Sequence, residues 1–254
     1  MPLVVTDAII LHAADYLESS RLLRLATREF GVLSVVARGA RSSRKRFGPA
    51  VGLFAIGQAQ LDMRPGRDMH TLTGFDVANA QAALATDLTR FSAASALAES
   101  AMRVVHDESA PAVYAVLLDA FGALGAAGGD TVIPTALGAF WRLVREVGFA
   151  PVLDDCAECH EPLPPDLDVT FSHSAGGVLC PRCARRAPGG RRLPASARAA
   201  ITGWLQETQP TLSRSEGRAH QRLLREFLGQ HLTDGRPLRA FADWEAGTFE
   251  PVEG

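Results

Sequence analysis

Four cysteines have the spacing of metal ligands. Two residues separate Cys156 from Cys159 and Cys180 from Cys183, and twenty residues lie between the two pairs. Two intervening residues let one tight turn direct both thiolates to the same ion, and two such turns complete a tetrahedron. A reducing compartment keeps thiols reduced, which argues against two disulfides. The pattern therefore predicts one structural Zn²⁺ ion per chain, held by all four cysteines.

The same four-cysteine shell limits the chemistry that this site can perform. A catalytic zinc ion keeps an open coordination position, which four thiolates close. The zinc deaminase pattern is missing, because His160 and Glu161 are adjacent. His160 and His173 could each replace a ligand, but loop positions are expected for both. Motifs of P-loop nucleotide hydrolases, serine hydrolases and zinc proteases are also missing, so the sequence predicts a binding protein and no enzyme.

A cationic cluster near the N-terminus is the second group that could do chemistry. Five basic residues fall within nine positions, and no acidic residue lies between Glu29 and Asp62. They are Arg38, Arg41, Arg44, Lys45 and Arg46. A charge run can be a solvated face, but a loop of a small barrel also binds nucleic-acid phosphates in this way. Phe47 and Phe54 could stack bases beside it, although buried core positions are expected for both.

Arginines also gather around the second cysteine pair. Residues 169–206 contain six arginines and no acidic residue. They are Arg182, Arg185, Arg186, Arg191, Arg192 and Arg198. This arginine zone either contacts phosphates or forms a solvated collar around the zinc ion, and the sequence leaves both open. The net charge of −2 conceals both basic regions, and the local field governs the choice of partner.

The elements that position these clusters begin with β-structure. Segments rich in Val, Ile, Leu and Thr lie at 3–13, 21–27, 32–38, 51–61 and 69–77. Five strands in so short a stretch favour a small closed barrel, because closure removes exposed edges. An SH3-like barrel and a small sandwich remain open at this point. We therefore expect a barrel domain over residues 1–79.

Helical periodicity follows the barrel. One apolar face runs over residues 84–105, a second helix is expected from near Ser109 with Pro111 in its first turn, and a third covers 134–147. Helices also follow at 196–207 and after Ser213, whose spacing to Glu216 matches a capping box. The prediction is an α+β multidomain protein, with a helical domain over 80–150 and 196–240 and a zinc-binding segment over 151–195.

Composition places this architecture in a broad class. The chain has 254 residues, of which 47% are hydrophobic, as in ordinary globular proteins with a sizeable core. No apolar run approaches the roughly 20 residues of a membrane-spanning helix. No secretory signal is evident either. We therefore expect a soluble cytoplasmic protein.

Two groups of motifs resemble the bacterial RecO recombination-mediator and DNA-repair proteins. The first comprises Ala8-Ile9-Ile10-Leu11, Tyr16-x-Glu18-Ser19-Ser20 and Ala37-Arg38-Gly39-Ala40-Arg41. The second comprises Phe140-Trp141-Arg142-Leu143, Gly148-Phe149-Ala150-Pro151, the two cysteine pairs and Gly176-Gly177. Together they span residues 8–183. One departure is His160, because this family often has glycine after the second cysteine. The difference puts in question the geometry of that turn and not the binding of zinc.

The resemblance implies an OB-fold barrel, a helical domain and a zinc-binding segment. It also implies binding of single- and double-stranded DNA, annealing of complementary strands, and help in loading recombinase onto strands covered by single-strand-binding protein. RecR, and through it RecF, are the partners that it implies. The basic loop from Arg38 to Arg46 is the predicted DNA contact. The rivals are a zinc-containing OB-fold translation or transcription factor that binds RNA and, among enzymes, a metal-dependent nuclease.

Overall fold

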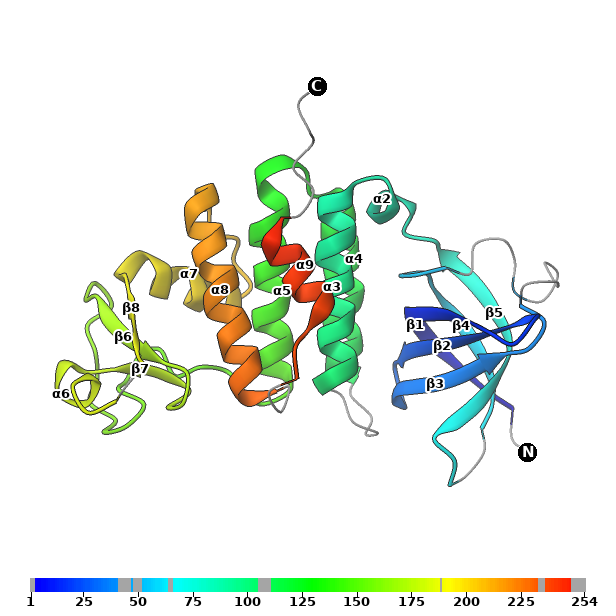
Figure 1. Ribbon diagram of the computed structural model, residues 1–254, viewed down its shortest axis with the longest axis horizontal. Coiled ribbons are helices and arrows are strands. Elements are labelled where there is room, and N and C mark those ends of the chain that lie inside the picture. Colours follow the sequence, from blue (N-terminus) through cyan, green and yellow to red (C-terminus); the bar gives the residue numbers. More distant parts are fainter. Residues whose placement is uncertain are drawn as a thin grey trace.

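Five strands close the N-terminal barrel in the computed structural model (Figure 1). They are β1 (Leu3–Tyr16), β2 (Ser20–Thr27), β3 (Gly31–Ala37), β4 (Ile56–Asp62) and β5 (Met69–Asn79). The order around the barrel is β1-β2-β3-β5-β4, with β1 pairing to β4 and with β3 and β5 parallel. This arrangement confirms the five-stranded OB-like barrel and excludes a sandwich. The structure describes residues 3–40, 47, 52–63, 66–104, 111–187, 189–232 and 236–247.

The barrel has an apolar interior and one apolar outer surface. Alternation along the strands directs Ile10, Leu25 and Val35 into the barrel core. The intervening residues point outward, and four of them are buried against the helical body. These four are Ile9, Leu11, Ala26 and Val32. The barrel and the helical body therefore share a packed boundary, which covers part of the outer face of β1, β2 and β3.

The start of β4 differs from the prediction. The strand begins at Ile56, whereas residues 52–55 form a turn. The Phe54 N–H donates to the Ile10 carbonyl at 2.8 Å, and Phe54 has a left-handed φ of 67°, which no strand accepts. The Phe54 ring lies 5.1 Å from that of Phe121 in the core, and Phe47 is buried as well. Neither phenylalanine is available to stack a base.

The helical body packs around α5. Its helices are α2 (Ala82–Ala85), α3 (Leu88–Val104), α4 (Pro111–Ala126), α5 (Val132–Glu146), α7 (Ala195–Leu205), α8 (Arg214–His231) and α9 (Arg239–Ala246), with the short 3₁₀ turn η1 (Gly129–Thr131) before α5. The helix predicted over 84–105 is two helices, because Asp87 accepts the Arg90 N–H at 2.9 Å and starts a new helix at Leu88. Pro111 opens α4 as predicted, whereas Ser109 lies outside the described residues.

Two helices have the terminal residues that their sequence favours, and a further helix, α9, was not predicted. Gly148 has a φ of 85° just after α5, and the Ser213–Glu216 capping box precedes α8. The helix α9 (Arg239–Ala246) starts just before residue 240, where the helical domain was expected to end, and continues past it. It packs against α3, where the Glu99 carboxylate accepts three backbone N–H bonds from its first turn.

A small three-stranded sheet holds the cysteine-rich segment at the end of the molecule opposite the barrel (Figure 1). Its strands are β6 (Val169–Ser172), β7 (Gly177–Leu179) and β8 (Arg191–Leu193), in the order β7-β6-β8. Phe171 of β6 packs on Phe227 of α8, which in turn contacts Trp141 of α5. This segment therefore uses the core of the helical body. Within the described residues, no helix has the length and apolarity needed to span a membrane.

Candidate metal centre and nucleic-acid face

The first cysteine pair lies on a tight turn that is attached to β7. The Cys156 N–H donates to the Glu161 carbonyl at 2.9 Å, and the His160 N–H donates to the Cys156 carbonyl at 2.8 Å. His160 has a left-handed φ of 59°. Glycine adopts this backbone conformation without steric cost. The histidine in place of the family's glycine therefore affects the turn and leaves the cysteines in place.

The second cysteine pair lies at the start of the one-turn helix α6 (Pro181–Ala184). Cys180 is its N-cap, with the Cys183 N–H 3.5 Å from the Cys180 sulfur and Pro181 in the first helical position. The two turns are brought together by backbone contact: a Cβ added to Gly177 would lie 2.3 Å from the Val152 carbonyl oxygen. Only glycine permits so close an approach to β7 of the Val152 backbone, which leads into the first turn.

The four cysteine sulfurs converge on one point. All four ligand atoms lie within 4.8 Å of one another, and the Cys159 and Cys180 sulfurs are 3.8 Å apart. Sulfurs about 2.3 Å from a common zinc ion lie about 3.8 Å apart in a tetrahedron. Cys156 and Cys180 are buried, and all four thiols are free of disulfides. The donor set and its spacing fit a tetrahedral zinc ion, and these four residues would hold it.

The thiols ionise unequally because they are so close together. Burial opposes ionisation of Cys156, but hydrogen bonds from backbone N–H groups, that of Cys180 foremost, outweigh it and lower the pKa of its thiol to about 6. The pKa of Cys183 is raised to about 12, first by its hydrogen bond to the Cys180 sulfur and then by burial. Each thiolate makes the next harder to form, and a bound dication would relieve that repulsion.

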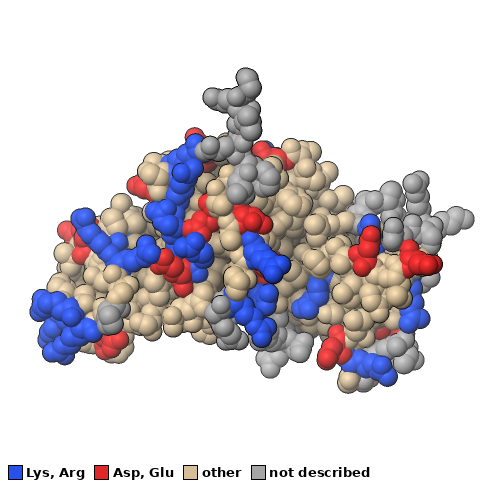
Figure 2. Space-filling model, in the orientation of Figure 1, with Lys and Arg blue, Asp and Glu red and all other residues tan. Residues whose placement is uncertain are grey.

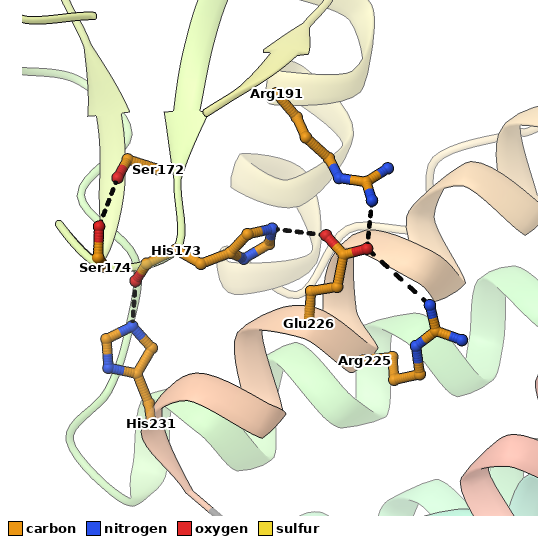
Figure 3. A network of polar contacts seen from close by, with 7 residues as sticks. All are labelled: Ser172, His173, Ser174, Arg191, Arg225, Glu226 and His231. Carbon is orange, nitrogen blue, oxygen red and sulfur yellow. Dashed lines mark hydrogen bonds and ion pairs between the residues drawn. The ribbon is translucent and has the colours of Figure 1, made fainter. Parts of the chain in front are cut away.

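Neither nearby histidine belongs to the sulfur cluster. His160 is exposed, and no histidine joins the metal-ligand group found among the described residues. Figure 3 shows the His173 ring directed at Glu226 of α8, with His173 Nε2 3.0 Å from a Glu226 carboxylate oxygen. Arg191 donates to the same carboxylate, and His231 Nε2 lies 2.6 Å from the His173 carbonyl oxygen. This polar network fastens the zinc-binding segment to α8.

Four of the six arginines in the arginine zone are engaged within the protein. Arg198 is buried and donates to the Pro164 and Leu163 carbonyls at 2.7 and 3.0 Å. Arg191 pairs with Glu226, and Arg192 pairs with Asp168. Arg182 is exposed and forms a longer ion pair with Glu161, at 3.8 Å. The acidic partners come from outside residues 169–206, so an acid-free stretch of sequence is not an acid-free surface.

The predicted basic loop is described only at its first residue. Arg38 follows β3 and is exposed, whereas Arg41, Arg44, Lys45 and Arg46 lie outside the described residues. Arg38 borders a hollow of about 580 Å³ together with Arg67 and Asp68 from the segment leading into β5 and His70 from the start of β5. These residues surround the end of the β3–β5 pair, where a loop of an OB-fold meets its strand face.

The structure adds Arg24 to this basic surface. Arg24 pairs in register with His12 of β1 and with Ser34 of β3, so it projects from the outer face of adjacent strands. It borders a second hollow of about 580 Å³ that also contains Arg67 and His70. Glu29 and Asp68 border this hollow as well. We call the surface formed by Arg24, Arg38, Arg67 and His70 the barrel face. The alternation Leu23-Arg24-Leu25, with both leucines buried, is the sequence signal that identifies Arg24.

The fold and the sites together define a class of protein: an α+β multidomain chain with an OB-like barrel, a helical body and a four-cysteine centre. Comparison with protein families is consistent with this class. The Recombination protein O N-terminal model matches residues 1–81, and the Recombination protein O C-terminal model matches residues 85–240. The chain therefore belongs to the RecO family.

Relatives along almost the whole chain agree. The DNA repair protein RecO of Anaeromyxobacter sp. strain Fw109-5 is 37% identical over 242 residues, which cover 92% of this chain and 93% of the relative. That of Anaeromyxobacter dehalogenans strain 2CP-C is 35% identical over 250 residues, covering 96% and 97%. That of Thermobifida fusca is 32% identical over 203 residues, covering 79% and 80%. Family membership supports a role in DNA repair and recombination.

Proposed function

We propose that this protein is a cytoplasmic recombination mediator that binds single- and double-stranded DNA and anneals complementary strands. With RecR, and indirectly RecF, it would help to load recombinase onto strands covered by single-strand-binding protein. The observation that carries the DNA-binding part is the barrel face, where Arg24, Arg38 and Arg67 border two neighbouring hollows on the strand face of an OB-like barrel. The recombinase-loading role and the partners are proposed from membership in the RecO family.

Annealing on such a surface requires no bond chemistry. Cations reduce the repulsion between two phosphate backbones and release condensed counterions when they bind. Arginine suits this task because its guanidinium group stays charged and can contact two phosphate oxygens at once. Arg41, Arg44, Lys45 and Arg46 would extend the barrel face with further phosphate contacts. The protein acts, on this proposal, by concentrating and aligning strands, and it is not an enzyme.

The zinc ion has a structural role in this proposal. Cys156, Cys159, Cys180 and Cys183 would hold one Zn²⁺ ion per chain, with no coordination position left for a substrate. The four thiols are free, as expected in a reducing cytoplasm. What these residues do is to join two turns and a short sheet into a unit that packs on α5 and α8.

Removing two charges from the barrel face tests the proposal. We expect Arg38→Gln with Arg67→Gln to weaken binding of single-stranded DNA about tenfold and to lower the slope of log K against log salt by roughly 1.4. Annealing of complementary oligonucleotides should slow in parallel. The matched control is Arg218→Gln with Arg222→Gln, which removes two exposed charges from α8. Equal losses in both pairs would contradict a DNA site on the barrel.

Competition separates the proposed function from its rivals. If the protein is a DNA mediator, unlabelled single-stranded DNA should displace labelled single-stranded DNA from it at much lower concentration than structured RNA does. The reverse order would favour an RNA-binding translation or transcription factor. Incubation of labelled strands with Mg²⁺ should leave them intact, and Mg²⁺-stimulated cleavage would indicate a nuclease.

A further inference from the structure

A crevice of about 600 Å³ lies where the barrel meets the helical body. Its volume falls within the roughly 300–1,000 Å³ of small-ligand sites. The barrel contributes residues of β1, β2 and the 52–55 turn, and the helical body contributes residues of α3 and α9. In Figure 2, basic side chains lie on both sides of this boundary. Of the residues that line the crevice, only Arg24 belongs to the barrel face described above.

The crevice has an apolar part formed by Leu11, Leu53 and Met102. The register between β1 and β2 shifts between Ile10 and His12, so Leu11 is the extra residue of a β-bulge. Leu53 precedes the left-handed Phe54, and 36% of its surface is exposed. Two backbone irregularities thus meet at one apolar surface, in which Leu11 is buried and solvent reaches Leu53 and Met102. A flat aromatic or heterocyclic ring is the kind of group that such a surface accommodates.

Arginines border this apolar part. Arg24 comes from β2, Arg103 from the last turn of α3, and Arg239 from the start of α9. The Arg24 Nε is buried and has no hydrogen-bond partner among the residues that the structure describes. A buried donor of this kind is stabilised by an acceptor, and an anionic ligand would supply one.

The two acidic residues of the crevice do not neutralise the positive charge of its three arginines. Glu99 accepts the backbone N–H groups of Arg239, Ala240 and Phe241 at 2.9, 2.8 and 3.3 Å. Its negative charge is therefore held against the positive end of α9. Asp243 also lines the crevice. Three arginines stand against these two carboxylates, so the crevice favours a ligand with negative charge.

We propose that the crevice binds one unstacked nucleotide of a single strand, with its base against Leu11, Leu53 and Met102 and its phosphate near Arg24, Arg103 and Arg239. This inference rests on the proposed DNA binding at the barrel face. Arg24 connects the two surfaces, because it borders both the crevice and a hollow of the barrel face. A paired and stacked base cannot enter, so the crevice gives the protein a preference for single strands that a general cationic surface lacks.

Charge removal inside the crevice tests this preference. We expect Arg103→Gln with Arg239→Gln to weaken binding of a thymidine oligonucleotide about tenfold and to leave the affinity for a blunt duplex unchanged. The matched control pair Arg218→Gln with Arg222→Gln should change neither affinity, and thermal unfolding should be the same for all variants. A loss that is equal for single strands and duplex would reduce the crevice to a general phosphate contact and overturn the proposal.

A fluorescent reporter tests where the base lies. Leu53→Trp places an indole at the exposed rim, and stacking of a base should quench its emission when the thymidine oligonucleotide is added. The duplex should leave the emission unchanged. An unquenched signal while the oligonucleotide is bound would overturn the proposal. Quenching by an oligoglutamate peptide and not by the oligonucleotide would overturn it too, and would assign the crevice to an acidic protein partner.

The two proposals fail in different ways. If the Arg38→Gln and Arg67→Gln pair loses DNA and the crevice pair does not, only the nucleotide site is wrong. If the unaltered protein binds neither single strands nor duplex, the proposed function and the crevice proposal are both wrong.

Discussion

The arginine zone and the barrel face look alike in sequence and differ in space. Arg191, Arg192 and Arg198 lie in the acid-free stretch, yet they contact Glu226, Asp168 and two backbone carbonyls. On the barrel, Arg24 and Arg38 border open hollows. Arginine density along the chain therefore does not measure the positive charge that a surface presents, because acidic partners can come from distant residues.

The two regions also differ in what stabilises them. The barrel has its own closed core of residues such as Ile10, Leu25 and Val35. The zinc-binding segment has short strands of three or four residues and packs its apolar side chains into the core of the helical body. The first region should survive alone, whereas the second should depend on its metal and on its attachment to α8.

Metal removal should produce the largest difference between the regions. We expect Cys180→Ser, or chelation of the unaltered protein, to lower the free energy of unfolding of the zinc-binding segment by more than about 4 kcal/mol. Hydrogen exchange followed by mass spectrometry should show lost protection at β6 and β7 and retained protection in β1 to β5. A chelator should have no further effect on the variant. Equal protection with and without zinc would show that this segment is stable without its metal.

Acid should destabilise the helical body through His220. Burial lowers the pKa of this histidine to about 4, although Glu216 acts in the opposite direction. Above pH 6.5 the histidine is neutral in both the folded and the unfolded state, so it contributes no pH dependence. Between pH 6.5 and pH 4 the unfolded state takes up the proton first, and folding should lose about 3 kcal/mol.

The variant His220→Phe isolates this effect from acid release of zinc. It keeps a ring against Trp204, whose ring centroid lies 5.0 Å from that of His220. Urea unfolding at several pH values should show a smaller loss between pH 6.5 and pH 4 in the variant than in the unaltered protein. Identical pH profiles would mean that acid acts at the cysteines alone.

Two arginines of the same zone should respond differently to substitution. Arg198→Met leaves the buried Leu163 carbonyl and the partly buried Pro164 carbonyl without their donor and should lower the free energy of unfolding by about 2 kcal/mol. Arg192→Gln removes an ion pair with Asp168 on the surface and should leave thermal unfolding nearly unchanged. If the two variants unfold at the same temperature, the internal role assigned to Arg198 is incorrect.

Local patterns predicted the parts of the fold that depend on neighbouring residues. The cysteine pairs, Pro111 at a helix start and the Ser213–Glu216 capping box all act within one turn, and the structure has each of them where expected. Phe54 shows where such patterns end. Its segment has strand-like composition, but its left-handed φ and its bond to Ile10 depend on tertiary contact.

The parts of the site that the sequence did not predict are formed by residues that are distant in sequence. Arg24 and Arg67 share one hollow although more than forty residues separate them in the chain. The crevice needs β2, α3 and α9 together, and α9 itself is placed by Glu99, which lies 140 residues before Arg239. Pattern alone cannot show such contacts, because they form only when the barrel and helical body pack.

The smallest effect is expected when the basic loop and the arginine zone are compared directly, with three charges removed from each. We expect Arg41→Gln, Arg44→Gln and Arg46→Gln together to lower the slope of log K against log salt for single-stranded DNA by roughly 2, because each lost phosphate contact removes about 0.7. The corresponding variant of Arg182, Arg185 and Arg186 should change the slope by much less. Fluorescence anisotropy between low and moderate salt measures both. Equal slope changes would show that the zinc-binding segment contacts DNA as fully as the barrel, and a change only in the second variant would move the DNA site away from the barrel.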